Sequence, residues 1–147
     1  MEQQFYEQIK RILSEARNKV YQTANFAMVE AYWNIGKSIV EQQDGYEKAE
    51  YGSRLIAELS KQMTIDFGKG FTPTNLKYMR QFYLTFPNSH ALRDELSWTH
   101  YRLLMRVENK NAREFYTEEA IKSNWSTRQL ERQINSFFYE RYNIIIL

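Results

Sequence analysis

The sequence contains no cysteine and only two histidines, which limits the chemistry it can support. A chain without thiols forms no disulfide and offers no thiolate to a metal, and this fits a reducing compartment, so we expect a cytoplasmic protein. Two histidines, His90 and His100, are too few for a histidine-based metal site. We therefore predict no metal site and no cofactor.

The sequence also has few helix breakers and no long apolar run. Two prolines and five glycines in 147 residues leave few points at which a helix must end. No apolar segment approaches the roughly 20 residues needed to span a bilayer, and the polar start shows no signal peptide. No strand pattern is convincing before the final Ile144-Ile145-Ile146-Leu147. These absences predict one all-α domain over residues 1–147 that has no membrane partner.

Apolar residues recur with helical spacing throughout residues 3–42. They are Phe5, Ile9, Ile12, Leu13, Ala16, Val20, Ala24, Ala27, Met28, Ala31, Ile35 and Ile39. Thr23 and Asn25 could mark a break, but nothing forces one, so the pattern predicts one long helix or a helix pair. One long helix would favour a partner helix from a second copy, and we expect a homodimer formed by residues 1–45. An antiparallel pair within one chain is the alternative.

Helix-start residues divide the remainder into two helix-turn-helix-like units. After a turn at 42–45 we expect helices over 48–67 and 73–86, a loop over 87–95, and helices over about 98–107, 112–123 and 126–141. Thr72 before Pro73, Ser97, and Ser126 with Gln129 are typical of helix N-termini. The first unit covers residues 46–95, and the second covers residues 96–147.

Charge is distributed unevenly although the net value is only +2. Residues 1–50 carry six Lys or Arg and eight Asp or Glu, whereas residues 101–147 carry eight and six. No carboxylate lies between Asp66 and Asp94, a stretch that contains Lys69, Lys77, Arg80 and Arg93. A local region without acids favours an anionic partner more than the total charge does.

Two outward helix faces are candidates for contact with DNA. In the first unit the candidates are Lys69, Thr74, Lys77, Tyr78, Arg80 and Gln81, with two glycines that let the backbone approach a phosphate. In the second unit they are Arg128, Arg132, Asn135 and Tyr139, opposite the inward residues Leu130, Ile134, Phe137 and Phe138. Arginine can fork onto phosphate or guanine, and asparagine can pair with adenine. The alternative is an ordinary solvated helix face.

No residue set supports catalysis. Asp94, Glu108 and Lys110 superficially resemble a restriction-type nuclease set, but that chemistry needs carboxylates held on adjacent strands to bind Mg²⁺. Here Glu108 and Lys110 fall at a helix end and a polar turn, where their Asn neighbours indicate capping. Trp125 and His100 are best explained as structural residues. We therefore predict no catalytic residue in this chain.

Several separated motifs, in order, resemble the N-terminal domain of the YhcG-type nuclease family, a domain of unknown function. They include residues 31–37 (AYWNIGK), 70–76 (GFTPTNL), 79–83 (MRQFY), 96–101 (LSWTHY) and 125–134 (WSTRQLERQI). In that family a PD-(D/E)xK nuclease domain follows, and members often lie near restriction–modification or defence genes. This chain stops before such a domain, so its catalytic residues have no counterparts here. The resemblance implies the non-catalytic half: DNA recognition, oligomerisation, or both.

Overall fold

The computed structural model describes residues 1–43 and 49–146, and every element of regular secondary structure within them is a helix. The helices are α1 (Gln3–Gln43), α2 (Ala49–Phe67), α3 (Pro73–Thr85), the short 3₁₀ helix η1 (Ser89–Ala91), α4 (Trp98–Leu104), α5 (Lys110–Lys122), α6 (Thr127–Asn135) and α7 (Phe138–Ile146). The all-α prediction is confirmed. The predicted turn at 42–45 falls partly outside the described residues.

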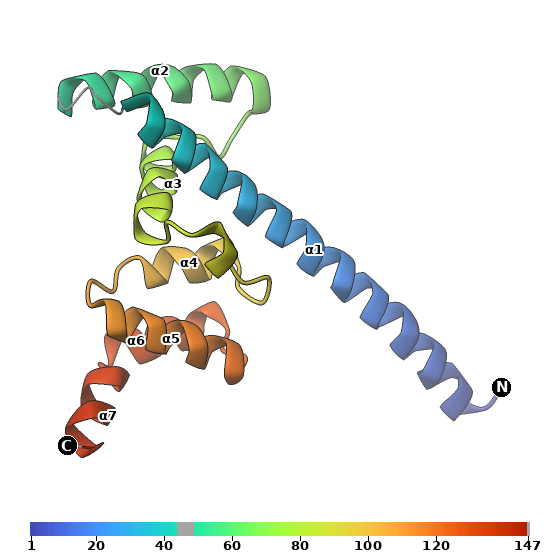
Figure 1. The fold of residues 1–147 in the computed structure, drawn as a ribbon. Coiled ribbons are helices and arrows are strands. Elements are labelled where there is room, and N and C mark those ends of the chain that lie inside the picture. The colour runs from blue at the N-terminus through green and yellow to red at the C-terminus, as the bar shows by residue number, and fades with distance from the viewer. Residues whose placement is uncertain (44–48, 147) are drawn as a thin grey trace.

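Residues 3–43 form one continuous helix, so the predicted alternative of a helix pair is wrong. This helix has 41 residues and is about 60 Å long at 1.5 Å per residue. Nothing interrupts it, because no proline lies in its interior and the first glycine is Gly36. Its first half projects away from the other helices as an arm, defined here as residues 3–25 (Figure 1). Near the base of the arm, the Gln22 side chain donates to the Asp94 carbonyl at 3.3 Å. The remaining described residues form the body.

The second half of α1 packs on α3 through a face that includes residues outside the predicted apolar stripe. Its buried residues are Val29, Trp33, Gly36 and Ile39, of which the periodic pattern contained only Ile39. A Cβ atom at Gly36 would collide with the carbonyl oxygen of Met79, so glycine lets α1 and α3 approach closely. The Trp33 indole N–H donates to the carbonyl of Phe86 at 2.7 Å. These contacts join the first helix to the end of α3.

The lower half of the body is organised around α4. Tyr101, Leu104, Tyr116 and Leu130 come from α4, α5 and α6 and are almost completely buried together. The Tyr101 hydroxyl accepts from the backbone N–H of Arg93 at 2.6 Å, which ties the preceding loop to α4. Burial raises the pKa of Tyr101 to about 12. Figure 1 shows α4 between α3 above and α5 and α6 below.

The predicted helix starts are confirmed by hydrogen bonds. Thr72 caps α3, and Ser97 and Ser126 each form a capping box. In the Ser97 box the third residue is His100, whose Nδ1 accepts from the Ser97 backbone N–H at 3.1 Å. His100 Nε2 therefore donates to the Trp125 carbonyl at 2.8 Å. His100 is a structural residue that joins α4 to the α5–α6 turn, as predicted.

The final helix is divided, which corrects the predicted helix over 126–141. α6 ends at Asn135 and Phe137 adopts a left-handed backbone with φ of 58°, so the chain turns before α7. The Tyr116 hydroxyl accepts a hydrogen bond from the backbone N–H of Tyr139 at 3.0 Å and donates one to the Glu140 carboxylate at 3.1 Å. The turn also lets aromatic residues of α7 pack on Phe115. Burial of these rings offsets the cost of the strained residue.

Two smaller predictions change as well. Phe137 is exposed instead of facing inward, because it occupies the turn. Residues 144–146 belong to α7, so the strand-like run at the end of the sequence is helical as far as it is described. Among the described residues, no helix is both long enough and apolar enough to cross a membrane.

Candidate nucleic-acid interface

The turn before α3 holds Lys69 on the surface between two glycines with positive φ. Gly68 and Gly70 have φ values of 80° and 110°, and no atom lies within 4 Å of a Cβ placed on either. Two hydrogen bonds fix the backbone of the turn: the Ser60 hydroxyl donates to the Phe71 carbonyl at 2.7 Å, and the Asn75 side-chain amide donates to the Gly70 carbonyl at 3.1 Å. The backbone there is open to a ligand and has a defined shape.

Helix α3 divides the predicted residues between two flanks. Thr74, Lys77 and Gln81 are exposed, whereas Tyr78 and Arg80 are half-buried on opposite sides. Arg80 points toward α1, where its guanidinium donates to the Gln43 side chain at 3.2 Å. Arg80 is therefore separated from the other α3 candidates. Arg93, from the same acid-free stretch, pairs with Glu95 at 2.9 Å and Glu118 at 3.5 Å.

Helix α6 presents Arg128, Arg132 and Asn135 to solvent. Leu130 on its opposite side is completely buried, so the phase predicted from the capping box is confirmed for this helix. Tyr139 does not continue the row, because α7 has turned and its ring lies 5.2 Å from that of Phe115. The α6 row therefore contains three of the four predicted residues. Glu131 lies beside them at the spacing of one helical turn.

Helix α4 and the turn that follows it carry two arginines, Arg102 and Arg106, that sequence reasoning missed and that connect α3 to α6. The Arg102 guanidinium carbon lies 4.3 Å from the centre of the Tyr78 ring, which is a cation–π contact. Arg106, one turn further along, lies 3.6 Å from the Glu131 carboxylate on α6. Tyr78, Arg102, Arg106 and Glu131 line one shallow cleft of about 230 Å³. Their spacing of four residues could have indicated a shared face, but only the fold places that face between α3 and α6.

The name basic face is used here for this cleft together with the polar residues that neighbour Tyr78 on α3 and Glu131 on α6. The set consists of Lys77, Tyr78 and Gln81 on α3, Arg102 on α4, Arg106 in the turn after α4, and Arg128, Glu131, Arg132 and Asn135 on α6. It carries five basic groups and one carboxylate. The carboxylate is held by a surface ion pair, which is worth roughly 0–1 kcal/mol. Arg106 can therefore exchange Glu131 for a phosphate at little cost.

No metal-binding arrangement accompanies this face within the residues that the structure describes: they contain no group of three His, Cys, Asp or Glu side chains able to hold an ion. Glu108 and Lys110 flank Asn109, whose side chain accepts from the Ala112 N–H at 2.9 Å and caps α5. The capping predicted for this segment is confirmed. α5 begins at Lys110, two residues earlier than expected.

Comparison with known proteins places the chain in a family. Residues 8–141 match the family described as the DUF1016 N-terminal domain, and the chain belongs to that family. It is also 34% identical, over 172 aligned positions, to the Escherichia coli (strain K12) protein named "Putative nuclease YhcG". That alignment covers 95% of this chain but 46% of the relative, so the chain spans about half of the relative's length. No solved structure matches this chain.

Proposed function

We propose that this chain binds DNA through its basic face and serves as the targeting half of a nuclease. The observation that carries the proposal is the connection of Tyr78 on α3 and Glu131 on α6 through Arg102 of α4 and Arg106 just after it. The relative named as a nuclease extends well beyond the region that this chain matches. The catalytic work would then belong to another part of such proteins, and a role in restriction or defence belongs to the same proposal.

Neutralisation of phosphates would provide most of the affinity. Five cationic side chains on one surface suit a polyanion, and each one that meets a phosphate releases counterions. Asn135 and the arginines of α6 could add limited reading of base edges, because amides and guanidiniums match adenine and guanine. Lys69 and Thr74 extend the surface past the start of α3, whose free backbone N–H groups favour an anion. Arg80 and Tyr139 are left out of this proposed contact.

A titration of duplex DNA over a range of salt concentrations tests the proposal. The quantity measured is the slope of log affinity against log salt concentration. Relative to the unchanged protein, we expect the magnitude of this slope to be smaller by roughly 1 to 2 in an Arg128→Ala/Arg132→Ala variant. The control is Arg54→Ala/Lys61→Ala on α2, which removes the same charge from exposed positions far from α6 in Figure 1. No binding at low salt, or equal effects of both variants, would contradict the proposal.

Glu131→Gln tests the cleft from the opposite direction. It removes the carboxylate beside Arg106 and frees that guanidinium. We expect tighter DNA binding and a slope larger by up to about 1. Weaker binding by this variant would indicate that the cleft does not face DNA.

A second function, association with another protein, is favoured by the arm. Apolar residues on its surface remain uncovered, including Ile12 at 58% exposure and Val20 at 66%. Such a patch on a protein surface is typical of an interaction site. Sedimentation of the chain at micromolar concentration tests this function, and a strict monomer that binds no other protein would remove it.

A further inference from the structure

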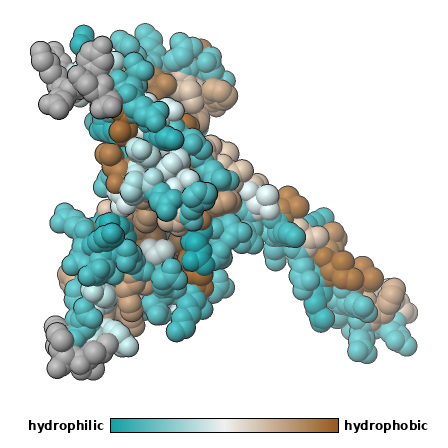
Figure 2. All heavy atoms as spheres, viewed as in Figure 1, coloured by the Kyte–Doolittle hydropathy of each residue, from teal (hydrophilic) through white to brown (hydrophobic). Residues whose placement is uncertain are grey.

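The arm carries an apolar stripe that nothing in the described chain covers. Phe5, Ile9, Ile12, Leu13 and Val20 are each about half exposed or more, although all lie within one helix. Hydrophobic residues are visible along the projecting arm in Figure 2. An isolated helix gains little from such residues in water, because packing supplies most helical stability. The stripe therefore indicates a partner that covers it.

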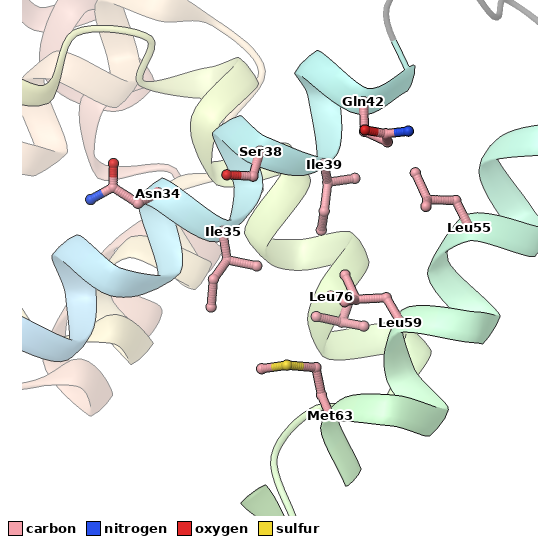
Figure 3. A pocket seen from close by; sticks show the side chains of 9 residues that line it. All are labelled: Asn34, Ile35, Ser38, Ile39, Gln42, Leu55, Leu59, Met63 and Leu76. Carbon is pink, nitrogen blue, oxygen red and sulfur yellow. The ribbon is translucent and has the colours of Figure 1, made fainter. Parts of the chain in front are cut away.

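The other end of the same helix borders an open apolar groove. The groove has a volume of about 500 Å³ and lies among α1, α2 and α3 (Figure 3). Its apolar lining consists of Ile35, Ile39, Leu55, Leu59, Met63 and Leu76. Figure 3 shows these side chains around a common space with α2 on one side, and Asn34, Ser38 and Gln42 also line it. A groove of this kind suits the apolar face of an amphipathic helix.

The stripe and the groove lie on one side of α1. Ile9, Val20 and Ala31 recur at intervals of 11 residues, as do Leu13, Ala24 and Ile35. An 11-residue interval turns a helix by just over three whole turns, so these positions form a nearly straight row. The row enters the groove at Ile35, whereas Trp33 lies about 160° away around the helix and faces the core. The groove side of α1 is thus distinct from its core side.

We infer that two copies pair antiparallel along α1, and that the arm of each copy occupies the groove of the other. A two-fold axis near residue 23, the middle of the 41-residue helix, would place Phe5 and Ile9 beside residues 37–41 of the second copy. The large side chains of Phe5 and Ile9 would then enter the groove. The small exposed residues Ala24 and Ala27 of the two copies would meet near the two-fold axis, where the helices cross. Small residues at a crossing let two helices approach closely.

Charge supports a second copy as the occupant. Residues 5–20 carry four basic and two acidic side chains. Two of the three groove walls, α1 and α2, are acidic on balance, because residues 28–43 carry one basic and two acidic side chains and residues 49–67 carry two and three. α3 carries two basic residues and no acid, but it lines the groove only through the buried Leu76. An arm of net charge +2 would therefore meet walls of net charge −1 and −1. Because the interface is two-fold, the same contact between a basic arm and the acidic α1 and α2 walls occurs twice, once for each copy.

The buried area approaches that of a standard interface. A contact strip about 60 Å long and about 10 Å wide covers about 600 Å² of each copy before the α2 wall is counted. A stable interface needs roughly 800 Å² from each partner. The α2 wall, which contributes Leu55, Leu59 and Met63, supplies much of the difference. A helix pairing restricted to the two arms would bury less than half of the roughly 800 Å² that each partner of a stable interface contributes.

This inference rests on the protein-association function and not on DNA binding. Sedimentation equilibrium of the full chain should give a dimer, and Ile9→Ser/Leu13→Ser should raise the dimer dissociation constant at least about 100-fold. The control Gln4→Ser/Asn18→Ser changes exposed, uncharged residues on the opposite side of the arm and should leave that constant within about 3-fold. Circular dichroism of each variant checks that the helices remain. A wild-type monomer at tens of micromolar, as expected if another protein covers the stripe, would overturn the inference.

Introduced cysteines distinguish antiparallel from parallel pairing, since the natural chain has none. Ala24→Cys lies near the proposed axis and should oxidise to a cross-linked dimer. Ile9→Cys should not cross-link with itself, because the two copies of residue 9 would lie about 42 Å apart along the axis. A mixture of Ile9→Cys and Ser38→Cys chains should form the heterodimer. Efficient self-linking by Ile9→Cys would show a parallel pair and refute the proposed arrangement.

The salt titration of DNA separates this inference from the DNA-binding proposal. The Ile9→Ser/Leu13→Ser variant retains every residue of the basic face. It should therefore bind DNA with a normal slope per chain, even when it is monomeric. A wild-type chain that is monomeric but binds DNA would refute the dimer alone, and a wild-type dimer that binds no DNA would refute the DNA-binding proposal alone.

Discussion

The two halves of α1 both carry regularly spaced apolar residues but have very different surroundings. In the arm, Ile9 is 48% exposed, whereas Ile39 in the body is 3% exposed. Both residues belong to the same set of apolar residues with helical spacing in the sequence. The difference teaches that helical periodicity identifies a face that should be buried, but it does not identify what buries it. In the body the cover comes from α2 and α3, and for the arm we infer a second copy.

Ile39→Ala should have the largest effect among changes that probe this comparison. Ile39 is buried in a cluster with Ile56, Leu76 and Met79, so truncation leaves a cavity between α1, α2 and α3. We expect the free energy of unfolding to fall by about 2–5 kcal/mol. Urea unfolding followed by circular dichroism measures this loss. A cost below about 0.5 kcal/mol would mean that this half of α1 is not packed as described.

The body should also show a stability that depends on alkaline pH. Burial raises the pKa of Tyr101 from 10.0 to about 12, so the folded protein keeps this proton while the unfolded chain loses it. The contribution of the Tyr101 hydroxyl to the free energy of unfolding is fully present below pH 10 and is lost as the pH rises toward 12. At pH 11 the loss should be about 1.4 kcal/mol. The free energy of unfolding should fall more between pH 9 and pH 11 in the unchanged protein than in Tyr101→Phe, by this amount. Equal decreases in the two proteins would contradict the prediction.

Ser126→Ala should weaken the body by about 1 kcal/mol. The Ser126 hydroxyl accepts the Gln129 N–H at 3.1 Å and belongs to the capping box that begins α6. Thermal unfolding of the variant measures the cost, with Ser136→Ala at the other end of α6 as a comparison. If the two substitutions cost the same, the start of α6 does not depend on its capping box.

Ile9→Ala should have the smallest effect on a single chain. Alanine favours helix slightly more than isoleucine does, and the side chain it replaces contacts little within the chain. We expect the free energy of unfolding to change by less than about 0.5 kcal/mol, provided that the protein is dilute enough to be monomeric. Repeating the Ile39→Ala measurement under the same conditions gives a matched pair. A large cost for Ile9→Ala in the monomer would show that the arm folds back onto the body.

Much of the candidate site could be predicted from local sequence because capping is a local interaction. Ser126 and Gln129 set the phase of α6, which placed Arg128 and Arg132 on the surface and Leu130 in the core. The same reasoning failed seven residues later. The left-handed Phe137 is stabilised by Tyr116, which is 21 positions earlier in the chain, and no local pattern reports that contact. Arg102 and Arg106 were missed for a similar reason, since their partners lie on α3 and α6.

The sequence by itself determined the helices, most of their starting residues and the absence of thiol chemistry, because these depend on neighbours within a few positions. The tertiary structure decided which apolar face of α1 enters the core, where the last helix turns, and how α4 joins the cationic residues of α3 and α6. Those outcomes depend on side chains that meet only after distant segments have packed, and their energies come from burial and close contact instead of local backbone preference.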